Sequence, residues 1–151
     1  MKNINRVIFA SGSGTSRAPM ATAIFHAMEH SRPIICEARG LVVQFPEPLN
    51  QKAEAILISN GIELKDYSSK QLMNSDFSDN TLIITMDETQ RQKILNEYES
   101  ATEENVKLLN ELVGDELEVM NPYGGSVQTY GLCYEVLKAS IEKLMRVIEA
   151  N

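Results

Sequence analysis

A short apolar run, followed at once by small residues and a proline, is the feature that most constrains the fold of this chain. Val7 to Ala10 are all apolar, which is typical of a parallel strand that is buried on both faces. Residues 11–16 are all Ser, Gly or Thr, which indicates a tight loop, and Pro19 suits the first turn of a helix. A strand, a loop and a helix in this order predict an α/β fold built on a parallel sheet.

The rest of the chain continues the alternation of strands and helices. Further strands are expected at 33–38, 81–86 and 106–109, and helices at 19–31, 48–60, 87–98 and 129–150. Asp87 is placed to cap the third helix, and residues 113–125 are expected to form a loop. The last helix is expected to face the core with one apolar stripe: Leu132, Val136, Leu137, Ile141, Leu144 and Ile148. We therefore expect one domain over residues 1–151.

The loop after the first strand has the composition of a phosphate-binding loop. Small residues allow successive backbone N–H groups to face an anion, and the N-terminus of the following helix adds its dipole. The planar fork of Arg17 suits phosphate oxygens. In open α/β sheets ligands bind at the carboxyl ends of the strands, where this loop lies. We therefore predict a phosphate site made of Gly12, Ser13, Gly14, Thr15, Ser16 and Arg17, with glycine suited to position 14 if the backbone there is left-handed.

Composition limits the partners of this chain. Its net charge of −7 gives no support to binding of nucleic acid or of an anionic membrane, and no apolar run approaches the length of a membrane span. The two cysteines, Cys36 and Cys133, do not make a disulfide framework and are expected to be small buried residues, so a cytoplasmic location is expected. His26 and His30 have the spacing of a metal pair but no third ligand, so we predict neither a metal nor a cofactor.

Three blocks of the sequence resemble one known family, the low-molecular-weight protein-tyrosine phosphatases. The apolar strand at 7–10, Arg17 and the Pro-Met-Ala of residues 19–21 resemble the end of the family's strand, Cys, five residues, Arg, Ser, Pro signature. Residues 121–126 (Asn-Pro-Tyr-Gly-Gly-Ser) resemble its Asp-Pro-aromatic-Gly-Gly-Ser loop in the bacterial branch, and residues 60–72 are similar to its glycine-isoleucine segment. This branch includes phosphoarginine phosphatase-like proteins. The resemblance implies a four-stranded parallel sheet flanked by helices in three layers.

The chemistry implied by the resemblance needs groups that this chain lacks. In the family a cysteine thiolate attacks phosphorus and an aspartic acid protonates the leaving oxygen. Ser11 stands at the position of the cysteine and Asn121 at that of the acid, while Ala18 replaces the serine after the arginine and Ser16 a second loop cysteine. A serine hydroxyl needs an adjacent base to attack, and a neutral amide is no acid. Four such changes together indicate a natural loss of catalysis.

We therefore hypothesise a pseudophosphatase, which binds phosphate or a phosphorylated protein side chain and serves recognition, competition or regulation of an active phosphatase or kinase partner. Tyr123 and Phe45 are candidate walls for an aromatic ring, although an aromatic residue such as Tyr123 is more often packed in its loop than a wall for a ligand, and Phe45 is equally a core residue. Thr15 resembles a threonine of the phosphoarginine branch, so phosphotyrosine is one ligand among others. One alternative is a slow but genuine phosphatase that uses Ser11 and a base brought in by the fold. Another is an interaction module whose loop is vestigial and binds nothing.

Overall fold

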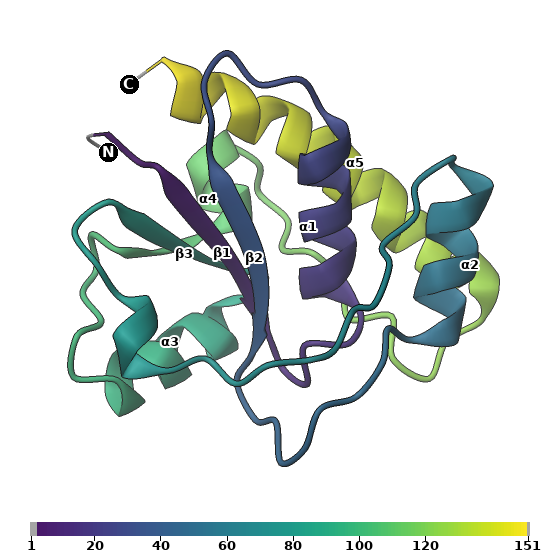
Figure 1. The fold of residues 1–151 in the computed structure, drawn as a ribbon, viewed down its shortest axis with the longest axis horizontal. Coiled ribbons are helices and arrows are strands. Elements are labelled where there is room, and N and C mark those ends of the chain that lie inside the picture. Colours follow the sequence, from purple (N-terminus) through teal and green to yellow (C-terminus); the bar gives the residue numbers. More distant parts are fainter. Residues whose placement is uncertain (1–2, 151) are drawn as a thin grey trace.

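The structure, a computed structural model, describes residues 3–150 and contains a four-stranded parallel sheet with the order β2-β1-β3-β4 (Figure 1). The strands are β1 (Arg6–Ser11), β2 (Ile35–Gly40), β3 (Thr81–Thr85) and β4 (Val106–Leu108). The helices are α1 (Arg17–Ala27), α2 (Gln51–Ser59), α3 (Glu88–Glu97), α4 (Leu109–Val113) and α5 (Val127–Glu149), with a 3-10 turn, η1 (Asn74–Asp76). The predicted α/β class and parallel sheet are confirmed.

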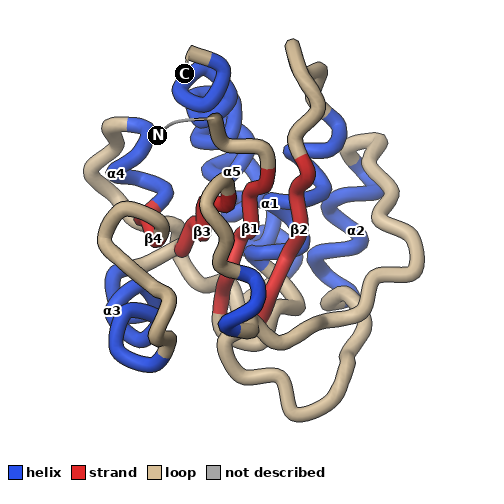
Figure 2. Tube along the Cα trace, turned by 60° about the vertical axis from the view of Figure 1, so that its left-hand side comes forward, coloured by secondary structure: helices blue, strands red, loops and turns tan. Residues whose placement is uncertain are grey.

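Apolar residues cover both faces of the sheet, which gives three layers (Figure 2). Along β1, Val7 and Phe9 belong to a cluster with α1, α2 and α5, whereas Ile8 and Ala10 belong to a second cluster with Ile94 of α3. This double coverage is the reason that β1 is apolar at consecutive positions. Helix α1 lies deep in the first cluster, and each of its residues from Arg17 to Phe25 is buried.

Some predictions about the elements are wrong: α1 ends at Ala27 and not at residue 31, and both the end of β4 and the buried face of α5 differ from the expectation. Leu109 does not end β4 but begins α4, which Gly114 ends in the left-handed conformation at φ 80°. In α5, Leu132 is 62% exposed and Val136 is 41% exposed, because the buried stripe begins at Tyr130 and continues at helical spacing through Cys133, Tyr134, Leu137, Ile141, Leu144 and Ile148. The apolar rings of the tyrosines shift this stripe around the helix axis from the position that the aliphatic residues alone suggested.

The predictions about the two cysteines and about the cap of α3 are confirmed. Cys36 and Cys133 are free and buried, as predicted. Asp87 caps α3 as predicted, since its side chain accepts a hydrogen bond from Gln90 N at 2.9 Å. Among residues 3–150, none of the helices combines the length and the apolar character needed to cross a bilayer.

The connectivity of the sheet places the end of β1 at a branch point. The chain leaves β1 to form β2 on one side, and it later adds β3 on the other side. Helix α1 follows β1 and helix α3 follows β3, and these helices cover opposite faces of the sheet (Figure 2). Ligands of open α/β sheets bind in the crevice at such a point. The loop of residues 12–16 occupies this position.

The loop between β1 and α1 requires glycine at position 14. Gly14 has a φ of +74°, a backbone conformation that residues with a side chain rarely adopt. A Cβ there would lie 2.9 Å from Gly40 N and 3.0 Å from Gly40 Cα, both in the backbone of β2. The loop can therefore pack against β2 only because this residue has no side chain.

We expect Gly14→Ala to lower the free energy of unfolding by more than the roughly 1–2 kcal/mol that a left-handed backbone costs an L-residue, because the new methyl group also meets Gly40. Gly61→Ala is a matched control: Gly61 has a φ of +75°, but nothing lies within 4 Å of its Cβ position. Urea denaturation of both variants measures the difference. Equal losses of stability would contradict a close contact between the loop and β2.

Candidate functional site

In the loop between β1 and α1, carbonyl groups accept hydrogen bonds from other parts of the protein, whereas most N–H groups are unpaired. Gly12 O accepts a hydrogen bond from Leu41 N at 2.7 Å, and Gly14 O accepts one from the Tyr67 hydroxyl at 2.5 Å. In the part of the chain that the structure describes, the N–H groups of residues 13–17 donate no hydrogen bond. Buried backbone donors are normally paired, so an array of free donors in one loop is suited to an anion.

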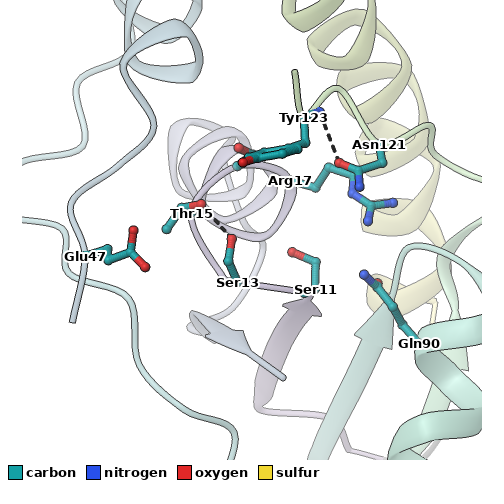
Figure 3. A pocket seen from close by; sticks show the side chains of 10 residues that line it. Ser11, Ser13, Thr15, Arg17, Glu47, Gln90, Asn121 and Tyr123 are labelled. Carbon is teal, nitrogen blue, oxygen red and sulfur yellow. Dashed lines mark hydrogen bonds between the residues drawn. The ribbon is translucent and has the colours of Figure 1, made fainter. Parts of the chain in front are cut away.

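A hollow of about 410 Å³ lies against this loop (Figure 3). The residues that line it come from the end of β1, the loop, the start of α1, the segment before α2, α3 and the segment before α5: Ser11, Gly12, Ser13, Thr15, Ser16, Arg17, Glu47, Gln90, Asn121 and Tyr123. The structure thus brings most of the predicted site residues together. Glu47 and Gln90 were missed from the sequence because neither belongs to a motif. Gln90 could have been suspected from its place just after the carboxyl end of β3.

Two predicted site residues do not line the hollow. Phe45 is 66% exposed and lies outside it, while Glu47, two residues later in the same segment, borders it. Gly14 belongs to the loop but is buried on the side of β2, and its left-handed conformation shapes the backbone of the loop. Tyr123 does border the hollow and is 82% exposed, so one face of its ring is available to a ligand.

Ser11 ends β1 at the base of the hollow and is 3% exposed (Figure 3). Its Oγ accepts a hydrogen bond from Ala18 N at 3.2 Å, in the first turn of α1. Among the described residues this is the hydrogen bond that Ser11 Oγ makes, so no carboxylate or imidazole is bonded to it. His26 and His30 lie toward the opposite end of α1 and beyond it, where each bonds to a backbone carbonyl group.

Arg17 begins α1 and is held by groups from two distant segments. It is 4% exposed, and its Nη1 donates to Val119 O at 2.9 Å and to Asp87 Oδ2 at 3.3 Å. The end of the Gln90 side chain faces two donors, so its amide oxygen is the atom turned toward them. In this orientation Gln90 Oε1 accepts from Arg17 Nη2 at 3.0 Å and from Gly12 N at 3.0 Å. Arg17 is therefore fixed at the edge of the hollow with a defined orientation.

Asn121 lies at the mouth of the hollow and makes a local turn. Its Oδ1 accepts a hydrogen bond from Tyr123 N at 3.2 Å, which orients the segment that carries both side chains (Figure 3). The bond from Arg17 to Val119 O holds this segment against the loop from two residues away. The side chain of Asn121 is thus well placed to touch a ligand, but as a carboxamide it has no acidic proton to transfer.

Burial raises the pKa of both cysteine thiols. Burial raises the pKa of the Cys36 thiol far above its ordinary value. Burial also raises the pKa of the Cys133 thiol, to about 11, although the nearby charge of Arg17 opposes the shift. Both groups are therefore protonated at neutral pH, and a thiol reacts as the thiolate. Within residues 3–150, no group of three or more His, Cys, Asp or Glu side chains could hold a metal ion.

The fold of this chain has close counterparts among solved structures. YwlE arginine phosphatase from Geobacillus stearothermophilus superposes with a TM-score of 0.87 at 22% sequence identity, over 96% of this chain and 93% of that chain. A cysteine-to-serine mutant of YwlE arginine phosphatase, with a phosphorylated active-site serine, superposes with a TM-score of 0.81 at 24% identity over 93% of each chain. These likenesses establish the fold.

Sequence comparison assigns the family. The low molecular weight protein-tyrosine-phosphatase PtpB of Staphylococcus epidermidis is 27% identical over 139 residues, which are 92% of this chain and 96% of PtpB. Residues 6–151 match the model of the family described as low molecular weight phosphotyrosine protein phosphatase. Together with the sheet order and the loop at the end of β1, this match shows that the chain belongs to the low molecular weight phosphotyrosine protein phosphatase family.

Proposed function

We propose that this chain binds phosphate or a phosphorylated side chain in the loop between β1 and α1, and that it does not hydrolyse phosphate esters efficiently. One observation carries the proposal: the site has the groups that bind an anion, but it lacks a nucleophile with a base and a general acid. Unpaired N–H groups and Arg17 border the hollow, whereas the side chains at its base and mouth are Ser11 and Asn121. Family membership supports a phosphorylated ligand.

The binding half of the proposal rests on backbone and arginine donors. Five consecutive N–H groups, from residue 13 to residue 17, are free to donate at the N-terminus of α1. Hydrogen bonds to a charged group are worth about 1.5–3 kcal/mol each, roughly twice a neutral one. Tyr123 offers an exposed ring beside the hollow, and Thr15 lines it. Phosphotyrosine and phosphoarginine are both compatible ligands, since each presents the same phosphoryl group.

The loss of catalysis follows from the groups that surround the phosphoryl position. The hydroxyl of Ser11 is a poor nucleophile without a base, and its hydrogen bond is to a backbone N–H. Asn121 cannot protonate a leaving oxygen, and the absence of a general acid costs about 10²–10⁴-fold in rate. A domain of this kind acts by holding a phosphorylated side chain, and so by recognition, by competition with an active phosphatase, or by regulation of a phosphatase or kinase partner.

The first test measures binding by titration calorimetry with inorganic phosphate and with phosphotyrosine. We expect both to bind the unmodified chain and Arg17→Ala to weaken binding about tenfold or more, because a charged donor is lost. Arg91→Ala is the matched control, since Arg91 lies on α3 and bonds to Glu88 and to Val106 O, away from the hollow. Equal affinity of the unmodified chain and Arg17→Ala would contradict the proposal. If the N–H resonances of residues 13–17 do not shift with phosphate, the loop is vestigial.

The second test restores the missing chemistry. We expect no hydrolysis of an aryl phosphate by the unmodified chain, and we expect Ser11→Cys with Asn121→Asp to exceed Ser11→Cys alone in kcat/KM by about 10²–10⁴-fold, the usual contribution of a general acid. The single variant serves as the control for the acid. Measurable hydrolysis by the unmodified chain that Ser11→Ala abolishes would refute the loss of catalysis.

A second candidate function is a slow phosphatase that works through a phosphoserine. The observation that favours it is the cysteine-to-serine mutant of YwlE arginine phosphatase, which carries a phosphorylated active-site serine on the same fold. Ser11 occupies the end of β1, and because its Oγ accepts a hydrogen bond from Ala18 N, its own proton is free to leave. In this reaction Ser11 Oγ would form a bond to phosphorus, the bond to the leaving group would break, and the serine proton would pass to the leaving group or to water.

Intact-mass spectrometry separates the two candidates. After incubation with an aryl phosphate or a phosphoarginine peptide, a slow phosphatase gains the mass of one phosphoryl group on Ser11 and then loses it as inorganic phosphate. We expect no such adduct to form, because Ser11 has no base. Ser11→Ala is the control for phosphorylation at other sites. An adduct on Ser11 that turns over would replace our first proposal with the slow enzyme.

A further inference from the structure

The carboxamide of Gln90 occupies part of the anion site in the ligand-free chain. With the amide oriented to satisfy both donors, its Oε1 accepts from Gly12 N at 3.0 Å and from Arg17 Nη2 at 3.0 Å, so one oxygen atom bridges a loop N–H group and the guanidinium. An oxygen of a bound phosphate would use donors of the same two kinds. Gly12 is also the residue next to the unpaired N–H groups of residues 13–17.

We propose that Gln90 is the affinity- and specificity-determining residue of this site, because its amide oxygen stands in for one anion oxygen and an entering anion must displace it. This inference rests on the proposed function, the binding of a phosphoryl group in the loop. It differs from that proposal in assigning a role to a side chain on α3, outside the loop and outside the segment of Asn121.

The position of Gln90 is fixed by its own helix. The N–H group of Gln90 donates to Asp87 Oδ1 at 2.9 Å in the cap of α3, while Asp87 Oδ2 is the acceptor 3.3 Å from Arg17 Nη1. The cap therefore sets the distance between the start of α3 and the guanidinium. Since the Gln90 side chain contacts Nη2 of the same guanidinium, both ends of Arg17 are occupied before a ligand arrives.

A neutral amide is suited to this role because it satisfies buried donors without adding charge. Arg17 is 4% exposed, and a buried donor without a partner destabilises the folded chain. The amide oxygen of Gln90 removes this penalty by accepting a hydrogen bond from the guanidinium. A phosphoryl group with its negative charge forms stronger hydrogen bonds to the same donors and can replace the amide. A neutral polar ligand gains little by such an exchange. Gln90 therefore makes the site selective for charged oxyanions.

The side chain has space to leave. A second hollow of about 440 Å³ lies beside the first, and the two share Arg17, Gln90 and Asn121 among their lining residues. Gln90 is only partly buried and lies at the shared boundary. Rotation about its side-chain bonds carries the amide toward the second hollow, which also contacts Thr89 and Met120. Displacement therefore requires no movement of α3.

The test compares the affinity for inorganic phosphate of the full chain and three variants, by titration calorimetry. We expect Gln90→Ala to bind phosphate about fivefold or more tightly, because two hydrogen bonds no longer have to be broken. Gln90→Glu should bind about tenfold more weakly or worse, because a carboxylate holds Gly12 N and Arg17 more strongly. Gln92→Ala is the matched control: it removes the same residue type from an exposed position of α3, where its amide bonds to Glu88.

A second readout does not depend on affinity. Without phosphate, the N–H resonance of Gly12 should move in Gln90→Ala relative to the unmodified chain and stay unchanged in Gln92→Ala, because only Gln90 is bonded to it. A general loss of structure would shift resonances throughout the sheet and is thereby distinguished from the loss of this one contact.

The outcomes separate this inference from the proposed function. If the unmodified chain binds phosphate and Arg17→Ala does not, but Gln90→Ala binds with equal or lower affinity, Gln90 is a ligand contact or a bystander and the inference fails alone. If neither the unmodified chain nor Gln90→Ala binds phosphate, the proposed function fails. If only Gln90→Ala binds, the amide is a complete block, which supports the inference and refutes binding by the natural chain.

Discussion

The hydrogen bonds of one buried guanidinium connect the parts of the molecule on which the candidate site depends. Arg17 begins α1, and it reaches the cap of α3 through Asp87 and the segment before α5 through Val119. Removing a guanidinium from water is costly unless its donors are paired and its charge is compensated. Here a carboxylate, a carbonyl and an amide together meet both requirements. The site is consequently formed in advance and is not assembled by its ligand.

The sequence was sufficient for the architecture because the decisive signals are local. The apolar run at 7–10 is typical of a strand covered on both faces, and the small residues after it form a loop at the carboxyl edge of the parallel sheet. The same signals located the loop and Arg17, whereas Asn121 was located by the resemblance to the family, and all of them border one hollow. The phase of α5 was misjudged because the rings of Tyr130 and Tyr134 were not counted with the aliphatic residues.

The remaining site residues belong to no motif, and their position in the site depends on tertiary packing. The segment that contains Phe45 and Glu47 has no regular secondary structure, so no periodicity indicates which side chain turns inward. Gln90 reaches the loop through the angle at which α3 leaves β3, a property of the packed molecule. A polar residue at that place in a sequence is most often an exposed one, as Gln92 is.

Binding and catalysis make different demands on the same scaffold, and our proposal is that this chain meets only the first. Holding an oxyanion requires donors at fixed positions, which a backbone loop and a buried arginine supply whatever the neighbouring side chains are. Breaking a phosphate ester requires groups whose pKa values allow proton transfer near neutral pH. Ser11 and Asn121 do not titrate in that range, and burial keeps both thiols protonated. The two abilities can therefore be separated by a few side chains without a change of fold.

The order of the strands has a consequence for how the chain is made. β1 precedes the other three strands of the sheet in the chain, yet it lies between β2 and β3, so one of its edges stays open until β3 has been synthesised. The hydrogen bond from Arg17 to Val119 O can form only later still, because Val119 lies 102 residues after Arg17 in the chain. Contacts of such long range form late during folding. Although the loop between β1 and α1 is synthesised before β2 and β3, the candidate site is completed only after the segment of Val119 has been synthesised.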